Sequence, residues 1–364
     1  MKVLVIGAGP SGLSCAQCLS ALSESDVTVI DKKHSIGENP RCAGGLSLFM
    51  MEKVGFSVPE SAIDARIKKL RIYAPNLKYW ELKGAEDYGY VLNRERFEQS
   101  MATNVVQQGG RINLGSPVSL RDMNGLVNKY DYIVGADGPV SIVREWLRLP
   151  RYSLEDVHIG VQKMISMDYY PQDTIELYFG EKVAPQGYAW IFPGGNGMVR
   201  VGLGVPSSKG SLAMLLLDRF ISRQVYDCKV VDSVGKQIPT AEMPRTGVYG
   251  KILLVGDALP STDPLTGGGI SQGIATGKAA AWALAEGKPR TYDMYVGWLR
   301  KQNNRRYKLK KVLYSFTDQD FNDMVAVMQG FRPQSLSVGK ELRRAITRLL
   351  WKKPRLLRKF FKYL

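Results

Sequence analysis

A short apolar run followed at once by spaced glycines constrains the fold of this chain more than any other feature. The run VLVIG, which begins at Val3, predicts a buried strand, and the segment GAGPSG that overlaps its end supplies Gly7, Gly9 and Gly12. Gly7 permits a tight turn, Gly9 lets the backbone approach a pyrophosphate, and Gly12 lets a helix pack closely on the strand. The phosphates would then lie at the helix N-terminus, where free N–H groups favour anions.

The second predicted strand supports the same interpretation. It reads DVTVID and ends in Asp31, which is placed to accept hydrogen bonds from a ribose hydroxyl. A glycine motif alone is weak evidence, but here the strand, the helix and the terminal acid follow one another in the expected order. The N-terminal segment therefore predicts dinucleotide binding in a Rossmann-type α/β unit.

Composition limits the class of protein. The 364 residues are enough for two domains, and 45% apolar with 23% charged residues is ordinary for a folded soluble protein. Four cysteines without regular spacing predict no disulfide framework, and hence a reducing compartment. The chain begins with a strand pattern rather than a signal sequence, and no run approaches the ~18 apolar residues of a membrane span. We therefore expect a cytoplasmic protein.

The net charge of +16 is unevenly distributed. Residues 298–364 contain eighteen Lys and Arg but only four Asp and Glu, so this segment carries fourteen of the sixteen net positive charges. A nucleic-acid-binding protein more often carries basic patches across its folded body. We therefore expect no nucleic-acid partner for the body of the chain.

Two later segments repeat the logic of a strand that runs into a functional turn. YDYIVGADGPVSIVR places Asp137 and Gly138 directly after an apolar strand. KILLVGDALPSTDPLTGGG does the same with Asp257, followed by Pro264 and a run of glycines that opens a helix of small residues. Asp-Gly is also good turn chemistry, but ordinary turns would not be expected to fall in this order with the glycine motif.

With these three segments the sequence resembles the FAD-dependent oxidoreductases of the p-hydroxybenzoate hydroxylase fold group. The resemblance implies that the first glycine motif holds ADP, that Asp257 binds the ribitol chain, and that the glycines after Pro264 face the isoalloxazine. The segment LNRERF matches the arginine segment of that group, which implies that Arg94 contacts the cofactor. The full set of predicted FAD-binding residues is Gly7, Gly9, Gly12, Asp31, Arg41, Arg94, Asp137, Gly138, Asp257, Pro264, Gly268 and Gly269. No metal site is expected.

The predicted architecture is an α/β fold with a Rossmann-type FAD-binding domain, a mixed β-sheet substrate domain and a helical C-terminal tail. The FAD-binding domain is expected to be discontinuous, with residues 1–65, 90–150 and 245–296. Residues 66–89 and 151–244 are expected to form the β-rich substrate domain, because alternating segments such as TIELYFG and MVRVGLGV predict strands. Residues 297–364 are expected to form the basic helical region.

The stretch PQGYAWIFPGG is the most distinctive part of the predicted substrate domain. Tyr188, Trp190 and Phe192 alternate, so on a strand their side chains share one face. They would form either an ordinary sheet core or the apolar wall of a substrate cavity. The pattern P-x-x-Y-x-W-x-F-P resembles the substrate-cavity motif of the geranylgeranyl reductase family, which favours the cavity.

A lone cysteine lies in the segment NPRCAGGLS. The same family carries a cysteine-glycine-glycine loop near the flavin, so the resemblance implies a catalytic loop at Cys42, Gly44 and Gly45. With an unperturbed pKa of about 8.5, the thiol would be mostly protonated near neutral pH and able to donate a proton. It would otherwise shape the pocket, hold a water that donates, or be a small residue at a turn.

The resemblance implies an enzyme that saturates isolated carbon–carbon double bonds of prenyl chains, in a membrane lipid or a prenyl quinone. Reduced flavin N5 would deliver a hydride, and a protic group would supply the proton inside a water-free aromatic cavity. The electron donor is open between a ferredoxin and a transiently bound NAD(P)H. The alternatives are an aromatic-ring monooxygenase of the same fold and a flavin-carrying membrane adaptor.

The C-terminal stretch KELRRAITRLLWKKPRLLRKFFKYL is basic and amphipathic. Leu and Phe residues recur at helical spacing between Arg and Lys, which is typical of helices that lie in the interface of an anionic membrane. A solvated basic helix or an RNA-binding tail would show the same charges. We therefore expect a peripheral protein at the cytoplasmic face of a membrane.

Overall fold

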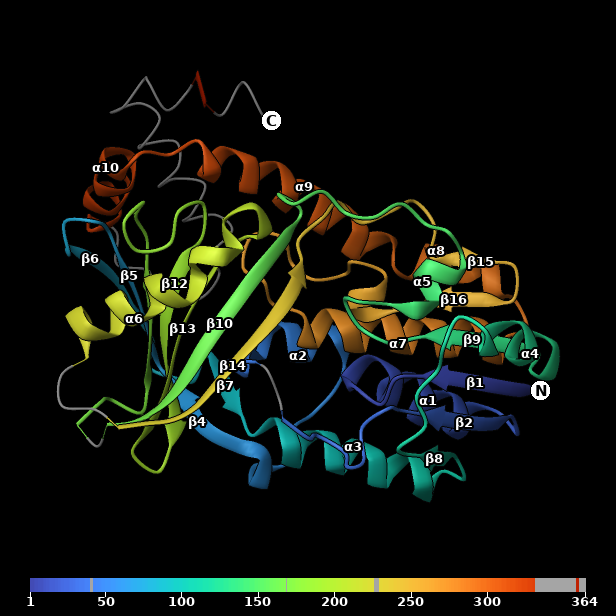
Figure 1. Ribbon diagram of the computed structural model, residues 1–364. Helices are drawn as coiled ribbons and strands as arrows, with labels where there is room; N and C mark the ends of the chain where they lie inside the picture. Colours follow the sequence, from blue (N-terminus) through green and yellow to red (C-terminus); the bar gives the residue numbers. More distant parts are fainter. Residues whose placement is uncertain (40–41, 168, 226–228, 331–357, 360–364) are drawn as a thin grey trace.

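The computed structural model describes residues 1–39, 42–167, 169–225, 229–330 and 358–359, and these residues form three sheets and the helices around them (Figure 1). The first sheet has the strand order β15-β16-β9-β1-β2-β8, and neighbouring strands are parallel except for β15 and β16. Its strands are β1 (Lys2–Ile6), β2 (Asp26–Ile30), β8 (Arg111–Asn113), β9 (Tyr132–Gly135), β15 (Val248–Tyr249) and β16 (Ile252–Leu254). The central strand β1 is buried on both faces, which explains its unbroken apolar run.

Helices α1 (Pro10–Leu22) and α7 (Ile270–Ala285) follow the first and last glycine segments and pack against each other. Their approach requires Gly277, because a Cβ at that position would lie 2.2 Å from the carbonyl oxygen of Ser11. The other helices attached to this sheet are α3 (Arg94–Gln107), α4 (Asp122–Lys129) and α5 (Ile142–Trp146). The α1–α7 contact brings two segments that are far apart in sequence to one side of the sheet.

The second sheet has seven strands in the order β14-β10-β13-β12-β11-β5-β6, and only the β11–β5 pair is parallel. The strands are β5 (Lys69–Tyr73), β6 (Tyr79–Lys83), β10 (Val157–Ser166), β11 (Thr174–Tyr178), β12 (Tyr188–Gly195), β13 (Met198–Pro206) and β14 (Lys229–Pro239). Helix α6 (Ala213–Gln224) covers one face, where Leu217 and Phe220 pack with Val161, Val201 and Leu203 in an apolar core.

The opposite face of this sheet carries the aromatic motif of β12. In the register of β12 and β13, Tyr188 pairs with Gly204 and Trp190 with Gly202. A Cβ at Gly202 would lie 2.4 Å from the Trp190 ring, so the indole occupies the space that this glycine leaves. The small residues of β13 are therefore the reason that the large rings of β12 fit on one face of a continuous sheet.

A three-stranded sheet joins the two larger ones. It consists of β3 (Gly45–Ser47), β7 (Gly89–Leu92) and β4 (Ile63–Ile67), and α2 (Leu48–Val54) follows β3 directly. The short α8 (Tyr292–Tyr295) leads into α9 (Gly297–Tyr314), and α10 (Asp318–Met328) follows. Figure 1 shows α9 running across the top of the molecule from the first sheet toward the second.

The predicted fold class is confirmed, since a Rossmann-type parallel sheet is combined with a mixed sheet and with C-terminal helices. The amphipathic part of the predicted tail, residues 340–364, lies outside the described residues except for 358–359. In the described part of the chain, no helix has the length and apolar character needed to cross a membrane.

Gly202→Ala should destabilise the protein, because the added Cβ would overlap the Trp190 ring. We expect a loss of about 1–3 kcal/mol in the free energy of unfolding, as for other overpacked cores, measured by urea denaturation. Gly204→Ala is the matched control, since its Cβ would meet its nearest neighbour, Trp190 again, at 3.9 Å. Equal stability of the two variants would contradict this account of the sheet.

Candidate active site

One continuous cavity of about 1070 Å³ contains nearly all of the predicted site residues. It exceeds the usual range of about 300–1,000 Å³ for small-molecule pockets. The cavity runs from the glycine loop before α1, past the cysteine loop, to the aromatic face of the seven-stranded sheet and the inner side of α9 and α10. It therefore has room for an elongated cofactor and for a second ligand beside it.

The glycine loop forms the phosphate end of the cavity. Gly7 has a φ of +110°, and a Cβ at Gly12 would lie 1.9 Å from the Gly7 carbonyl oxygen, so both positions require glycine. A Cβ at Gly9 would meet nothing within 4 Å, which leaves its backbone open to the cavity. Asp31 accepts a hydrogen bond from the backbone N–H of Ala8 (2.7 Å), so the acid also holds the loop in place.

Three residues that line the cavity carry a buried polar atom with no hydrogen-bond partner within the described part of the chain. The atoms are the hydroxyl of Tyr88, Nε of Arg94 and Oδ1 of Asp137. The other carboxylate oxygen of Asp137 accepts from the N–H of Val143 (3.1 Å), and burial raises the pKa of Asp137. Unsatisfied buried groups need partners, and the hydroxyl-rich ribityl and pyrophosphate chain of FAD supplies them. The residues present fit this cofactor.

Asp257 lies at the turn between β16 and α7. Its carboxylate accepts hydrogen bonds from Nζ of Lys236 (2.8 Å) and Oγ1 of Thr262 (2.9 Å). Burial alone would raise the pKa of Asp257, but the Lys236 ammonium and these hydrogen bonds lower it below its ordinary value. A Cβ at Gly269 would lie 3.3 Å from Oδ1 of Asp257, so the glycine run lies against this acid. Of the same group, Gly138, Pro264, Gly268 and Gly269 also line the cavity.

The cysteine loop is fixed from two sides. A Cβ at Gly45 would lie 2.7 Å from the Phe192 ring, so the loop packs directly on the aromatic motif. Gly44 has a φ of +82°. From β13, Nη1 of the buried Arg200 donates to the carbonyl oxygens of Ala43 (2.9 Å) and Leu92 (3.0 Å). The backbone around the thiol is thus held against the aromatic face of β12. The predicted cofactor residue Arg41 lies outside the described residues.

The environment of Cys42 differs from the expectation of an unperturbed thiol. Burial would raise the pKa of Cys42, but the charge of Arg94, the N–H of Gly44 (3.4 Å from Sγ) and the charge of Lys236 outweigh burial and lower it. By contrast, burial raises the pKa of Cys15 and Cys18 on α1. Among the described cysteines, Cys42 is therefore the one whose surroundings lower the pKa of the thiol.

The end of the cavity beside the seven-stranded sheet is lined by aromatic rings in contact with one another. The ring centres of Trp190 and Tyr188 are 5.9 Å apart, and those of Tyr188 and Phe179 are 5.8 Å apart. Phe179 stacks on Phe321 of α10 with 5.2 Å between the ring centres. The polar ends of two rings are satisfied, because Trp190 donates to Gln162 (3.3 Å) and Tyr188 donates to the carbonyl of Thr266. All three predicted substrate residues, Tyr188, Trp190 and Phe192, line the cavity.

A polar group closes the cavity beneath α9. His158 at the start of β10 contacts Oγ1 of Thr240 through Nδ1 (2.9 Å) and the Tyr314 hydroxyl through Nε2. Lys310 donates to the carbonyl of Thr240 (2.9 Å) and pairs with Asp156 (3.3 Å). Burial and the nearby Lys310 charge lower the pKa of His158 to about 4, so the imidazole is neutral at physiological pH.

Four residues of the site were not predicted. Lys236 of β14 and Arg306 and Lys310 of α9 line the cavity, and Arg200 of β13 is buried and holds the cysteine loop through the carbonyl of Ala43. A signal for Arg200 was present, because it interrupts the apolar segment MVRVGLGV on the face that also carries the two glycines. The residues of α9 gave no such signal, since they belong to a segment whose dominant feature is its positive charge.

The comparisons with known proteins define the class. Residues 156–238 match the model of the geranylgeranyl reductase catalytic domain, and residues 5–42 match that of the NAD(P)-binding Rossmann-like domain. A solved structure described as geranylgeranyl bacteriochlorophyll reductase-like, from Thermoplasma acidophilum, is similar with a TM-score of 0.87 and 25% identity, and covers 100% of this chain and 99% of its own. The flavin-dependent halogenase CmlS shares the fold, with a TM-score of 0.64 and 16% identity. The chain is an FAD-dependent oxidoreductase.

Curated relatives place it in a family. A digeranylgeranylglycerophospholipid reductase of Methanosphaera stadtmanae is 31% identical over 97% of this chain and 93% of its own length. Another from Methanothrix thermoacetophila is 28% identical over 96% of this chain and 97% of its own. The chain belongs to the geranylgeranyl reductase family.

The low pKa of Cys42 can be measured by alkylation. Because the thiolate reacts with iodoacetamide, Cys42 should be labelled at lower pH than an ordinary thiol, with peptide mass spectrometry as the readout. Arg94→Met removes a cation that lowers the pKa, so the labelling curve should move to higher pH. Arg96→Met, an exposed neighbour on α3, is the control and should leave the curve in place. Coinciding curves for wild type and Arg94→Met would contradict the assignment.

Proposed function

We propose that the enzyme saturates isolated carbon–carbon double bonds of geranylgeranyl-type chains carried by a membrane lipid or a prenyl quinone. The observation that carries the proposal is the continuity of the cavity, in which most of the predicted FAD residues, Cys42 and the aromatic residues of β12 line one space. The names of the curated relatives and of the matching catalytic domain support the same substrate class.

In this proposal the chain contributes a dry, ring-lined channel and a proton. FAD, when bound and reduced, supplies the hydride for one alkene carbon. Tyr188, Trp190 and Phe192 exclude water and offer ring faces to any positive charge that develops on the chain. Cys42 gives its proton to the other carbon, and the cations of Arg94 and Lys236 stabilise the thiolate left behind. A pKa below the ordinary thiol value suits this role, because a general acid works best when its pKa lies near the operating pH.

Anaerobic turnover separates this function from the alternative. Chemically reduced enzyme, incubated without oxygen with geranylgeranyl lipids and with prenyl quinones, should yield products heavier by one pair of hydrogens per reduced bond, read by mass spectrometry. An aromatic-ring monooxygenase would instead consume oxygen in proportion to substrate and give no product under these conditions. A flavin-carrying adaptor would not be reoxidised by any prenyl substrate.

Cys42→Ala should keep FAD bound and slow alkene reduction by about 10²-fold or more, as expected for loss of a general acid. The rate is measured by anaerobic stopped-flow reoxidation of the reduced flavin, and FAD content by absorbance. In the wild type the rate should fall on the alkaline side as Cys42 loses its proton. Cys18→Ala, on the back of α1, is the control with unchanged turnover. Full activity of Cys42→Ala would reduce the thiol to a turn residue.

We propose further that the basic tail brings the enzyme to the cytoplasmic face of an anionic membrane. The support is the amphipathic pattern of residues 340–364, which lies almost wholly outside the described residues. Removal of residues 340–364 should weaken binding to anionic liposomes in a salt-dependent way. Flotation assays at low and high salt would measure this, and equal binding without the tail would refute it. Whether a ferredoxin or NAD(P)H reduces the flavin is an open part of the proposal.

A further inference from the structure

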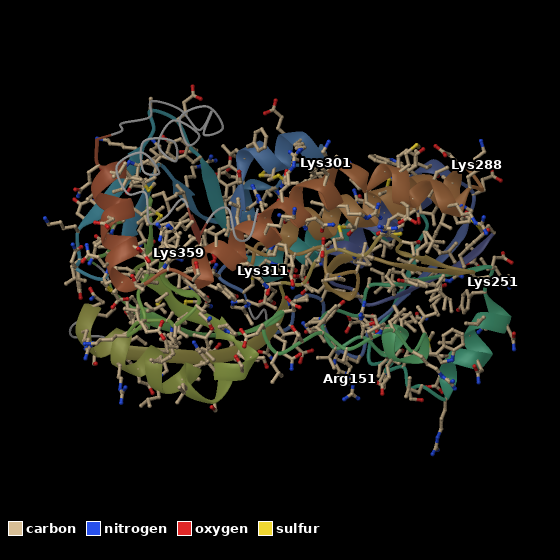
Figure 2. The ribbon with its side chains drawn as sticks, turned by 90° about the horizontal axis from the view of Figure 1, so that it is seen from above. Arg151, Lys251, Lys288, Lys301, Lys311 and Lys359 are labelled. Atoms are coloured by element: carbon tan, nitrogen blue, oxygen red, sulfur yellow. The ribbon has the colours of Figure 1, made fainter. Side chains whose placement is uncertain are left out.

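The outer side of α9 carries a row of cations that the reaction does not use. Trp298, Lys301, Arg305 and Lys308 recur at spacings of three and four, so they share one face of the helix. Lys301, Arg305 and Lys308 are exposed, and none of them forms an ion pair with another described residue. Figure 2, which looks down on this side of the molecule, labels Lys301 and, near the other end of the same helix, Lys311.

Aromatic side chains lie between the basic residues of this surface. Nζ of Lys53 on α2 lies 3.9 Å from the centre of the Trp298 ring, which joins α2 to α9. Lys278 on α7 donates to the carbonyl of Gly55 at the end of α2 (2.8 Å) and lies over Trp282, which is 39% exposed. Helix α8 contacts both α7 and α9, so the four helices α2, α7, α8 and α9 form one surface.

We define the docking face as eight basic, aromatic or apolar residues of this surface that are exposed or half-exposed. They are Lys53, Lys278, Trp282, Met294, Trp298, Lys301, Arg305 and Lys308. Met294 is 68% exposed. Two exposed acids lie beside it on the same helices or their ends, Glu52 and Glu286, and the second accepts a hydrogen bond from Tyr295. The face thus has a clear excess of positive charge, interleaved with indole rings.

We propose that this docking face binds the surface of an anionic lipid bilayer. Lys and Arg are attracted to anionic headgroups, and Trp prefers the interface between headgroups and acyl chains. A purely acidic protein partner would match the cations but not the exposed Trp282 and Met294. The proposal goes beyond the reaction, and it does not depend on which lipid or quinone is reduced.

The position of the face relative to the cavity supports this partner. Phe49, which is 60% exposed, lines the cavity and lies one turn before Lys53 on α2, so both share one face of that helix. On α9, Arg306, Lys310 and Leu313 line the cavity from the side opposite Lys301. A bilayer held against the docking face would therefore lie beside Phe49 and above the helix that covers the apolar channel.

The test is binding of the full-length, FAD-loaded enzyme to vesicles of phosphatidylcholine with or without phosphatidylglycerol. The wild type should bind only the anionic vesicles, and less at high salt. The variant K301Q/R305Q/K308Q should bind roughly 10- to 100-fold more weakly. The matched control R219Q/R223Q/K229Q removes the same charge from exposed positions on α6 and at the start of β14, and should bind like the wild type.

Two more readouts keep the result interpretable. FAD content and turnover of detergent-dispersed substrate should be unchanged in both triple variants, so misfolding or failure of the proposed reaction is seen separately. Trp282→Ala should lower the binding that survives at high salt. Unchanged binding of the α9 variant, equal loss in both variants, or loss only in the control would overturn the proposal. The proposal would also be overturned by a third pattern. In that pattern the wild type does not bind anionic vesicles, and the flavin of the α9 variant is reduced by a reduced ferredoxin more slowly than the flavin of the wild type.

Discussion

The site depends on one buried guanidinium. Arg200 extends from β13 of the seven-stranded sheet, pairs with Asp64 of β4, and donates to the carbonyls of Ala43 and Leu92. A charge removed from water is stable only when it is paired and its N–H groups are satisfied, and here all three partners belong to the three-stranded sheet and the loop beside it. The same contact requires Gly44, whose Cβ would lie 2.5 Å from Nη1 of Arg200. Arg200 therefore fixes the position of the cysteine loop relative to the seven-stranded sheet.

A second group of charges connects the cofactor side with the thiol. Lys236 reaches from β14 to Asp257, while Arg94 on α3 pairs with Glu98, and both cations act on Cys42. Each cation is paired with a carboxylate, Lys236 with Asp257 and Arg94 with Glu98. Both cations nevertheless lie near enough to Cys42 to stabilise its thiolate, which lowers the pKa of the thiol. The pKa of the Cys42 thiol is therefore lowered by cations from two distant parts of the chain, α3 and β14, together with the N–H of Gly44 in the loop itself.

This distinction explains what the sequence predicted. The phosphate loop at Gly7 and the turn at Asp257 were predictable because their chemistry is contained in a few consecutive residues next to a strand. Lys236 was not, because β14 is largely exposed and its lysine looks like part of a solvated face; its role arises from pairing across β10. Arg306 was not predicted for a related reason. The basic composition of residues 298–364 suggested a region separate from the site, whereas Arg306 on α9 lines the cavity.

The two sides of α9 show why pairing tells more than charge count. On the inner side, Arg306 pairs with the buried Asp263 and Lys310 with Asp156, because a cation that lines an apolar cavity must be neutralised to be stable there. On the outer side, Lys301 and Arg305 are exposed to water and form no ion pair with another described residue. The two faces of α9 therefore differ: the cations that face the cavity are paired with carboxylates, and the cations that face solvent are not. The proposed reaction, with a dry channel and a substrate drawn from lipid, would impose both requirements, and a single amphipathic helix between cavity and solvent would meet them together.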